Sequence, residues 1–331
     1  MAFERVFEYI GEFGPYQKRI LHLVCLIALP TAIHTMLPVF INADTDHHCQ
    51  IKYLDGMNCS RWDLTTNECE DAKLRLSIPD DDESTIFVDE RKCMIRNISV
   101  DEFYPDLNET EIEQFDVVDC YAGWTYDTSQ YKSTIVQEFD IVCGQSHRAT
   151  TSWTVYFGGV LFGSFLFGNI ADLFGRKPTF FIALGLQVVS EILIAFVPAF
   201  WLYSLCRFIV GMANMGVYLI GFVLVTEYVG PTKRTMAGSL FAIYWSLGYM
   251  FIAVLAFLFR EWRKLIIVST CVGVPLFFIF PFVPESVQWL NSKSKKEEAK
   301  EVLRKIATSN KTQIPEGVLD EILTEKQMVC E

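Results

Sequence analysis

The sequence lacks the motifs that mark the commonest nucleotide-driven proteins and hydrolases. It contains no G-x-x-x-x-G-K-[ST] phosphate loop, no G-x-S-x-G nucleophile turn and no H-E-x-x-H zinc-binding helix. A surplus of basic residues is also missing, because 28 lysines and arginines stand against 40 aspartates and glutamates, so nothing supports a nucleic-acid partner. We therefore expect no enzyme activity, no cofactor and no movement driven by ATP hydrolysis.

Long apolar segments dominate the amino-acid sequence. Hydrophobic residues make up 51% of the 331 residues, and the mean hydropathy is +0.26. Six segments each approach the roughly 20 residues that a helix needs to cross about 30 Å of hydrocarbon. The pattern predicts an all-α integral membrane protein with six transmembrane helices at residues 20–41, 153–171, 178–197, 201–225, 236–259 and 265–283.

Acidic residues are concentrated between the first two apolar segments. Residues 42–148 carry 24 acidic and nine basic side chains, which leaves 16 acidic and 19 basic side chains elsewhere. By the positive-inside rule this distribution predicts a plasma-membrane protein whose acidic loop is extracellular. The predicted order is a cytosolic N-terminus (1–19), the first membrane helix (20–41), an extracellular loop (42–148), membrane helices two to six (149–283) and a cytosolic helical segment (284–331).

The same loop holds six of the ten cysteines and three glycosylation sequons. An even number of cysteines in a translocated segment predicts disulfides, although six thiols allow fifteen pairings. A zinc site is the alternative, but the spacings include no C-x-x-C pair, so we expect no metal. The cysteines are Cys49, Cys59, Cys69, Cys93, Cys120 and Cys143, and the sequons begin at Asn58, Asn97 and Asn108.

A charged hairpin follows the second apolar segment. Asp172 would cost about 2.5 to 3.5 kcal/mol at the bilayer centre, so we expect it at the interface with Arg176, four residues on, as its partner. Gly175 suits a left-handed turn, and Gly168 removes a side chain where another helix can approach. A generic basic loop is the alternative interpretation.

Together these motifs resemble the organic cation, carnitine and organic anion transporter family of the major facilitator superfamily. The resemblance runs through the whole chain in order, but it is weak for the substrate. Its further motifs are the Gly-Glu-Phe-Gly-Pro start (11–15), the Ser-Thr-Ile-Val-Gln-Glu-Phe-Asp-Ile-Val-Cys segment (133–143), Thr-Glu-Tyr-Val-Gly-Pro (226–231) and Pro-Glu-Ser-Val-Gln-Trp-Leu (284–290). Two departures are Gln288, where the family usually has arginine, and six apolar segments where the family has twelve.

The resemblance implies the N-terminal six-helix half of a gradient-driven transporter that works by alternating access. The implied substrate is a small organic ion, with a cation or a carnitine-like zwitterion favoured, and the implied surroundings are the lipid bilayer. The chain would then be a truncated record or a short isoform, whose partner is a missing C-terminal half or a full-length relative. The alternative is a non-transporting half that acts as a membrane-anchored regulatory or interaction subunit.

Two intramembrane charges are predicted to pair. Glu191 and Arg207 each lie eight residues from the turn near residue 199, so antiparallel helices would place them at similar depth. Pairing would neutralise two charges that are otherwise costly in the membrane. A structural ion pair is favoured over a substrate site.

Several polar and aromatic side chains are candidates for the substrate path. Tyr218, Phe222 and Thr226 share one helix face with Asn214, and the resemblance implies that such a face presents aromatic rings to a cation. His34 and Trp245 are further candidates, and packing or a backbone hydrogen bond is the alternative role. The resemblance also implies that Glu227, Arg234 and Glu285 join Asp172 and Arg176 in a cytosolic gate.

Overall fold

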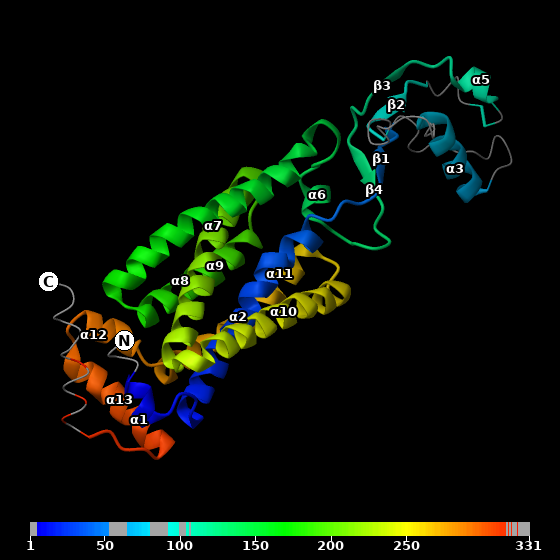
Figure 1. Ribbon diagram of the computed structural model, residues 1–331. Helices are drawn as coiled ribbons and strands as arrows, with labels where there is room; N and C mark the ends of the chain where they lie inside the picture. The colour runs from blue at the N-terminus through cyan, green and yellow to red at the C-terminus, as the bar shows by residue number, and fades with distance from the viewer. Residues whose placement is uncertain are drawn as a thin grey trace. The chain divides into compact units, whose positions relative to one another are not determined.

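The chain forms two compact units in the computed structural model. The structure describes residues 5–52, 65–79, 92–98, 104–105 and 107–315, together with residues 317, 319 and 323. One unit, here the helical unit, comprises Met1–Ile41 and Ser152–Glu331, and the other, here the loop unit, comprises Asn42–Thr151. Asn58 and Cys59 lie outside the described residues. Each unit is described by itself (Figure 1).

Six helical segments are long and apolar enough to cross a membrane, which confirms the predicted fold class. All of them are longer than 18 residues. They are α2 (Pro15–Ile41), α7 (His147–Phe174), α8 (Arg176–Ile194), α9 (Phe200–Tyr228), α10 (Arg234–Leu258) and α11 (Trp262–Gly273), the last continued by the 3-10 helix η7 (Val274–Phe282).

The presence of these helices was predicted more accurately than the residues at which they begin and end. The first helix begins at Pro15, not at residue 20, because proline is well suited to the first helical position and needs no backbone donor there. The predicted helix at 265–283 begins at Trp262 and changes to 3-10 geometry at Val274. Pro275 and Pro281 explain this change, because neither can donate an α-helical hydrogen bond.

Helix α2 lies at the centre of the helical unit, where it packs against α9, α10 and α11. The core between these helices is apolar and includes Val24, Ile27, Val217 and Phe241. Glycines bring two helices into especially close contact: a Cβ on Gly159 or Gly163 of α7 would clash with a backbone carbonyl oxygen of α9. In contrast, a Cβ on Gly168 would meet no described atom within 4 Å, so the close approach that we predicted there lies two turns earlier.

A second, smaller core joins the two ends of the helical unit. It is formed by α1 (Val6–Ile10), α12 (Val287–Ser292) and α13 (Lys296–Asn310), whose apolar faces meet around Phe7 and Leu303 (Figure 1). Asn310 fastens this core to the start of α2. Its side-chain amide donates to the carbonyl oxygen of Ile10 at 2.9 Å and to Oε1 of Gln17 at 2.8 Å, and its Oδ1 accepts from the backbone N–H of Tyr16.

The loop unit contains short strands that the all-α prediction did not include. Antiparallel pairs join β1 (His47–Cys49) to β4 (Trp124–Tyr126) and β2 (Met94–Arg96) to β3 (Val117–Asp119). These strands are only three residues long, and β-branched and aromatic residues favour them in β3 and β4. The helices here are α3 (Thr66–Ser77), α5 (Glu109–Ile112), α6 (Ile135–Glu138) and the 3-10 helix η5 (Cys143–Gln145).

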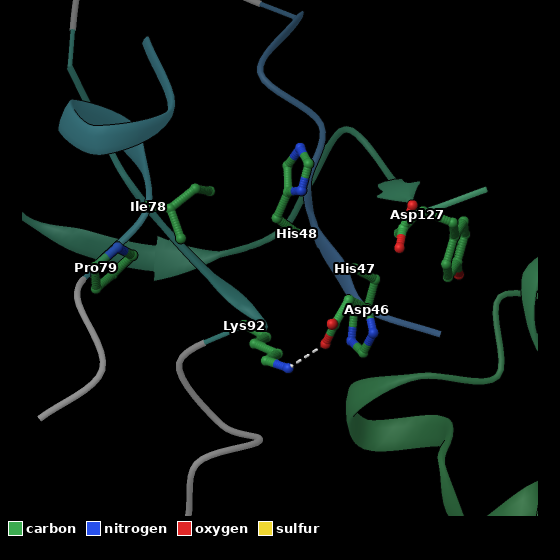
Figure 2. A pocket seen from close by; sticks show the side chains of 8 residues that line it. Asp46, His47, His48, Ile78, Pro79, Lys92 and Asp127 are labelled. Carbon is green, nitrogen blue, oxygen red and sulfur yellow. Dashed lines mark hydrogen bonds and ion pairs between the residues drawn. The ribbon is translucent and has the colours of Figure 1, made fainter. Parts of the chain in front are cut away.

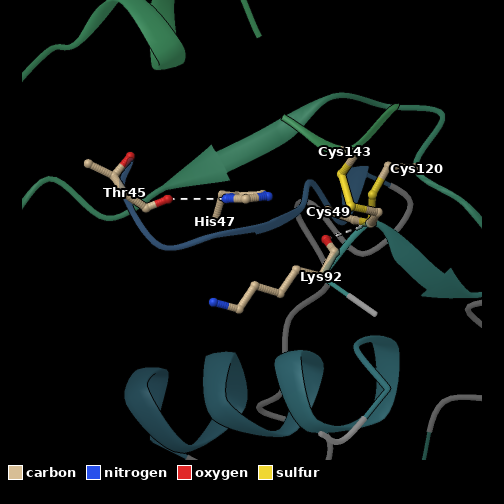
Figure 3. The surroundings of a disulfide bond; sticks show 7 residues. Thr45, His47, Cys49, Lys92, Cys120 and Cys143 are labelled. Carbon is tan, nitrogen blue, oxygen red and sulfur yellow. Dashed lines mark hydrogen bonds between the residues drawn. A yellow bond between two sulfur atoms is a disulfide. The ribbon is translucent and has the colours of Figure 1, made fainter. Parts of the chain in front are cut away.

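Disulfides hold these short elements together. Cys49 is bonded to Cys120, and Cys93 is bonded to Cys143. Figure 3 shows Cys49, Cys120 and Cys143 close to one another, and Cys49 is the last residue of β1. Cys69 is also disulfide-bonded. Asn97 and Asn108, which begin two of the predicted sequons, have exposed side chains that a glycosylating enzyme could reach.

The close contact between α7 and α9 can be tested with neighbouring glycines. We expect Gly159→Ala to lower the unfolding temperature in detergent, because its methyl group would press on the carbonyl oxygen of Phe208. Overpacking of this kind costs about 1 to 3 kcal/mol. Gly158→Ala is the matched control, since its nearest neighbour would lie 3.9 Å away. Equal stability of the two variants would contradict the close packing.

Candidate functional site

Three ionisable side chains meet in the interior of the helical unit. Glu191 of α8 is 0% exposed, whereas His34 of α2 and Arg207 of α9 are each 1% exposed. Oε1 of Glu191 lies 3.3 Å from Nδ1 of His34 and 3.7 Å from Nη1 of Arg207. The structure thus brings together the two charges expected to pair and adds His34, which sequence reasoning had considered separately. We call these three residues the buried triad.

A hydrogen-bonded asparagine lies next to the buried triad. Asn214 of α9 is 4% exposed, and its amide donates to the carbonyl oxygen of Thr31 at 2.9 Å and to Oγ1 of Thr35 at 3.1 Å. Thr35 follows His34 directly in α2. Asn214 was predicted to extend a substrate-facing surface, but in this structure its side chain is buried and joins α9 to α2.

An aromatic cluster lies along the same face of α9. Tyr218 stacks edge-on against Trp245 and Phe241 of α10, with ring centroids 4.9 and 5.6 Å apart, and Phe222 lies 6.1 Å from Phe241. Tyr218 and Phe222 remain 37% and 39% exposed, so the protein covers each side chain only in part. Thr226, the next candidate along this face, is half-buried and donates to the carbonyl oxygen of Val223.

The charged hairpin between α7 and α8 has the local geometry that its sequence predicts. Gly175 adopts a φ of 118°, which residues with a Cβ strongly resist. Arg176 forms an ion pair with Asp172, and its Nε lies 3.9 Å from Oε1 of Glu227. The side chain of Arg176 therefore contacts two of the three predicted gate carboxylates, Asp172 and Glu227. Arg234, the other basic residue expected in the gate, is the first residue of α10.

Glu285 caps the start of α8. Its Oε1 accepts backbone hydrogen bonds from Arg176 at 2.9 Å, Lys177 at 3.1 Å and Ser286 at 2.9 Å. A carboxylate is favourable here because the N-terminus of a helix carries unpaired N–H groups and a partial positive charge. Trp289 adds a second tie by donating its indole N–H to the carbonyl oxygen of Asp172 at 3.0 Å. The segment after η7 is thus fastened to the hairpin.

The loop unit contains a separate cavity of about 460 Å³ that is lined in part by charged side chains. Figure 2 shows Lys92 beside Asp46, 2.8 Å away, and this ammonium lowers the pKa of the Asp46 carboxyl. Burial lowers the pKa of His48 in the same cavity. His47 lies within 4.8 Å of the sulfur atoms of Cys93 and Cys143, but these sulfurs are joined in a disulfide and are not thiolate ligands. Sequence reasoning had singled out none of the charged residues of this cavity.

Comparison with known proteins gives a consistent result. Residues 111–330 match the sugar (and other) transporter family. The chain is 33% identical to the organic cation transporter protein of Drosophila melanogaster and 31% identical to the human organic cation/carnitine transporter 2, covering 98% and 96% of this chain. It covers 56% of each relative, so it spans about half their length.

The fold resembles a solved transporter. The partially occluded, inward-open structure of the xylose transporter XylE from E. coli aligns with a TM-score of 0.55 and 14% sequence identity. The alignment covers 95% of this chain and 59% of that chain.

The pairing of Arg207 with Glu191 predicts a specific rescue. We expect Arg207→Leu to reduce the amount of folded protein at the cell surface, because it leaves Glu191 charged and buried. Breaking a buried pair in this way costs about 3 to 5 kcal/mol. The double variant Arg207→Leu with Glu191→Leu should recover most of the surface signal, measured by surface biotinylation. Normal surface expression of the single variant would contradict the pairing.

The capping role of Glu285 predicts a loss of stability. We expect Glu285→Ala to lower the unfolding temperature, because three backbone N–H groups lose a charged acceptor, at a cost of about 1 to 3 kcal/mol. Glu297→Ala is the control, since Glu297 contacts Lys300 on the exposed side of α13 and should contribute little. If both variants unfold at the same temperature as the unchanged chain, capping by Glu285 does not contribute to stability.

Proposed function

Because this chain belongs to the sugar (and other) transporter family and is a multi-pass membrane protein, we propose that it acts in the transport of small organic ions. A cation or a carnitine-like zwitterion is the favoured substrate class. The printed names of two relatives, an organic cation transporter and an organic cation/carnitine transporter, support this choice. No enzyme activity is part of the proposal, since the family is one of transporters.

The observation that carries the proposal is the half-open aromatic cluster of Tyr218, Phe222 and Trp245. An aromatic face attracts an ammonium group by about 0.5 to 2 kcal/mol, and the attraction is stronger where water is excluded. Tyr218 and Phe222 each keep more than a third of their surface exposed, whereas His34 and Asn214 are buried. We therefore assign substrate contact to the rings and a supporting role to Asn214.

We assign gating to the charged hairpin and its partners. Arg176 lies between Asp172 and Glu227, and Glu285 holds the backbone at the start of α8. Exposed or half-exposed charges of this kind can exchange partners when two halves of a transporter move, as alternating access requires. Arg234, at the start of α10, is the further basic residue of this proposed gate.

The proposed orientation places the loop unit outside the cell at the plasma membrane. Three features support an extracellular position: the acidic composition of the loop unit, its disulfides, and the exposed sequon residues Asn97 and Asn108. The N-terminus and the core around α13 would then be cytosolic. Transport would be driven by solute or ion gradients, without ATP.

Uptake by oocytes that express residues 1–331 tests the proposal. The probes are radiolabelled tetraethylammonium, L-carnitine and p-aminohippurate, a cation, a zwitterion and an anion. We expect saturable uptake of a cation or zwitterion above that of water-injected oocytes. Tyr218→Leu should weaken the apparent affinity about 2- to 30-fold, which corresponds to the loss of one cation–π contact.

Phe257→Leu serves as the matched control for Tyr218→Leu. Phe257 lies on α10, is exposed, and is not part of the aromatic cluster, so its replacement should leave the affinity unchanged. Absence of uptake for all three probes, with the chain present at the surface, would refute transport by this chain alone. Co-purification with a full-length relative would then support the alternative of a regulatory subunit.

A further inference from the structure

The loop unit contains a cavity of about 790 Å³ that plays no part in the proposed transport function. This volume falls in the range of about 300 to 1,000 Å³ that is typical of small-molecule sites. All of the residues that line the cavity belong to the loop unit. We call it the Trp124 cavity, after the aromatic side chain in its wall.

The strand pair β1 and β4 forms part of the wall of the Trp124 cavity. In its register Cys49 lies opposite Trp124, and His47 lies opposite Tyr126. Residues that lie opposite one another share a face of the sheet, as do residues two apart on one strand. Both His47 and Trp124 line the cavity. The two short strands thus place an imidazole and an indole on the same wall.

His47 has an unused hydrogen-bond acceptor. The residue is only 9% exposed, and its Nδ1 lies 3.1 Å from the carbonyl oxygen of Thr45. Because a carbonyl oxygen can only accept, Nδ1 carries the hydrogen of the neutral ring and Nε2 carries a lone pair. Nε2 has no hydrogen-bond partner among the described residues. In Figure 3 this nitrogen points away from Thr45 and toward Cys143, which also lines the Trp124 cavity.

Trp124 has an unused hydrogen-bond donor. Its indole Nε1 is buried and has no acceptor among the described residues. A buried donor without an acceptor is unfavourable, so a ligand oxygen that accepts from it would gain stability. Tryptophan is also the side chain whose ring attracts cations most strongly. Trp124 can therefore contact a ligand through its N–H group and through its ring.

The Trp124 cavity is negatively charged. Asp44 and Asp119 line it with exposed side chains, and neither forms an ion pair or a side-chain hydrogen bond with another described residue. No lysine or arginine is among the described residues of its wall. The surrounding segment, residues 42–148, carries 24 acidic and nine basic side chains, so its overall field also attracts cations. The charge favours a cationic ligand over an anionic one.

The carboxylates are not arranged to hold a metal ion. Among the described residues, His47 forms a group of potential metal ligands only with Cys93 and Cys143, whose sulfurs are joined in a disulfide. Asp44 and Asp119 do not belong to that group. A metal ion requires several ligand atoms at about 2 Å, which these separated groups do not provide. They fit a larger molecule that extends from one group to the next.

We propose that the Trp124 cavity is a second binding site of this protein, for an organic ammonium ion that carries N–H groups and an oxygen acceptor. In this site the positive charge lies near Asp44, Asp119 and the ring of Trp124. An N–H group of the ligand donates to Nε2 of His47, and its oxygen accepts from Nε1 of Trp124. The proposal is independent of transport, because it concerns the loop unit and not the aromatic cluster of the helical unit.

Tyramine is a suitable probe because it joins an ammonium group to a phenol oxygen. The full chain in lipid nanodiscs can be labelled with 5-fluorotryptophan, and its seven tryptophans can be followed by 19F NMR. Trp124 reports on this cavity, and Trp245 reports on the aromatic cluster. We expect tyramine to shift the Trp124 signal in a saturable way. The matched anion 4-hydroxyphenylacetate should leave that signal unchanged at the same concentration.

The two carboxylates can be tested without disturbing the fold, because both are exposed. We expect Asp44→Asn and Asp119→Asn each to weaken tyramine binding at Trp124 by about 2- to 5-fold, as the loss of one exposed ionic contact implies. Glu113→Gln is the matched control, since it changes an exposed carboxylate of the loop unit outside the cavity. Equal affinities in all three variants and the unchanged chain would overturn the proposal.

The N–H requirement can be tested with a second ligand. The N,N,N-trimethyl derivative of tyramine keeps the positive charge but has no N–H group on its ammonium. We expect the unchanged chain to bind tyramine more tightly than this derivative, and His47→Phe to bind both equally. If His47→Phe fails to fold, the comparison on the unchanged chain still decides, because equal affinities there would contradict the assigned role of His47.

The two reporter signals separate this proposal from the proposed transport function. A tyramine shift at Trp245 alone, abolished by Tyr218→Leu, would overturn the second site and support the substrate contact at the rings. A shift at Trp124 that persists in Tyr218→Leu would support the second site, whatever the outcome of the uptake measurement. The Trp124 signal is assigned by its loss in Trp124→Phe or, if that variant fails to fold, by replacing the other tryptophans one at a time.

Discussion

The absence of water inside a membrane is the constraint on which the helical unit depends. Every polar group that enters the hydrocarbon must find a partner within the protein, because an unsatisfied group costs several kcal/mol there. Most helices meet this requirement through their own backbone bonds. Asn214 and Thr35 meet it by bonding across α9 and α2. The buried triad meets it only in part, by placing opposite charges close together without hydrogen bonds between them.

Close helix packing makes those partnerships reproducible. The glycines of α7 allow its backbone to touch α9, and Gly248 of α10 lies similarly close to the backbone of Leu29 in α2. Helix α2 packs between α9, α10 and α11. This packing fixes the positions of Thr31, His34 and Thr35 along the helix axis, so that they lie opposite Asn214 and Glu191. The polar contacts therefore depend on small residues that make no polar contact themselves.

The sequence predicted the six membrane segments because hydropathy over about 20 residues is a strong local signal. It also predicted that Glu191 and Arg207 face one another, since a short hairpin relates residues at equal distance from its turn. It did not predict that His34 joins them, because the contact between α2 and α8 spans 157 residues and no local pattern encodes it. Disulfide pairing and the short strands of the loop unit were unpredictable for the same reason.

Glu285, beside the start of α8, and Glu191, within α8, show how hydrogen bonding distinguishes a carboxylate with a fixed position from one without. Glu285 accepts hydrogen bonds from three backbone N–H groups, two of which belong to the first turn of α8 and are fixed by that helix. Glu191 accepts no geometrically satisfactory hydrogen bond and lies near two buried side chains, those of His34 and Arg207. A carboxylate held by the backbone has one arrangement of low energy. A carboxylate that lies between two side chains without a hydrogen bond to either is not fixed in this way.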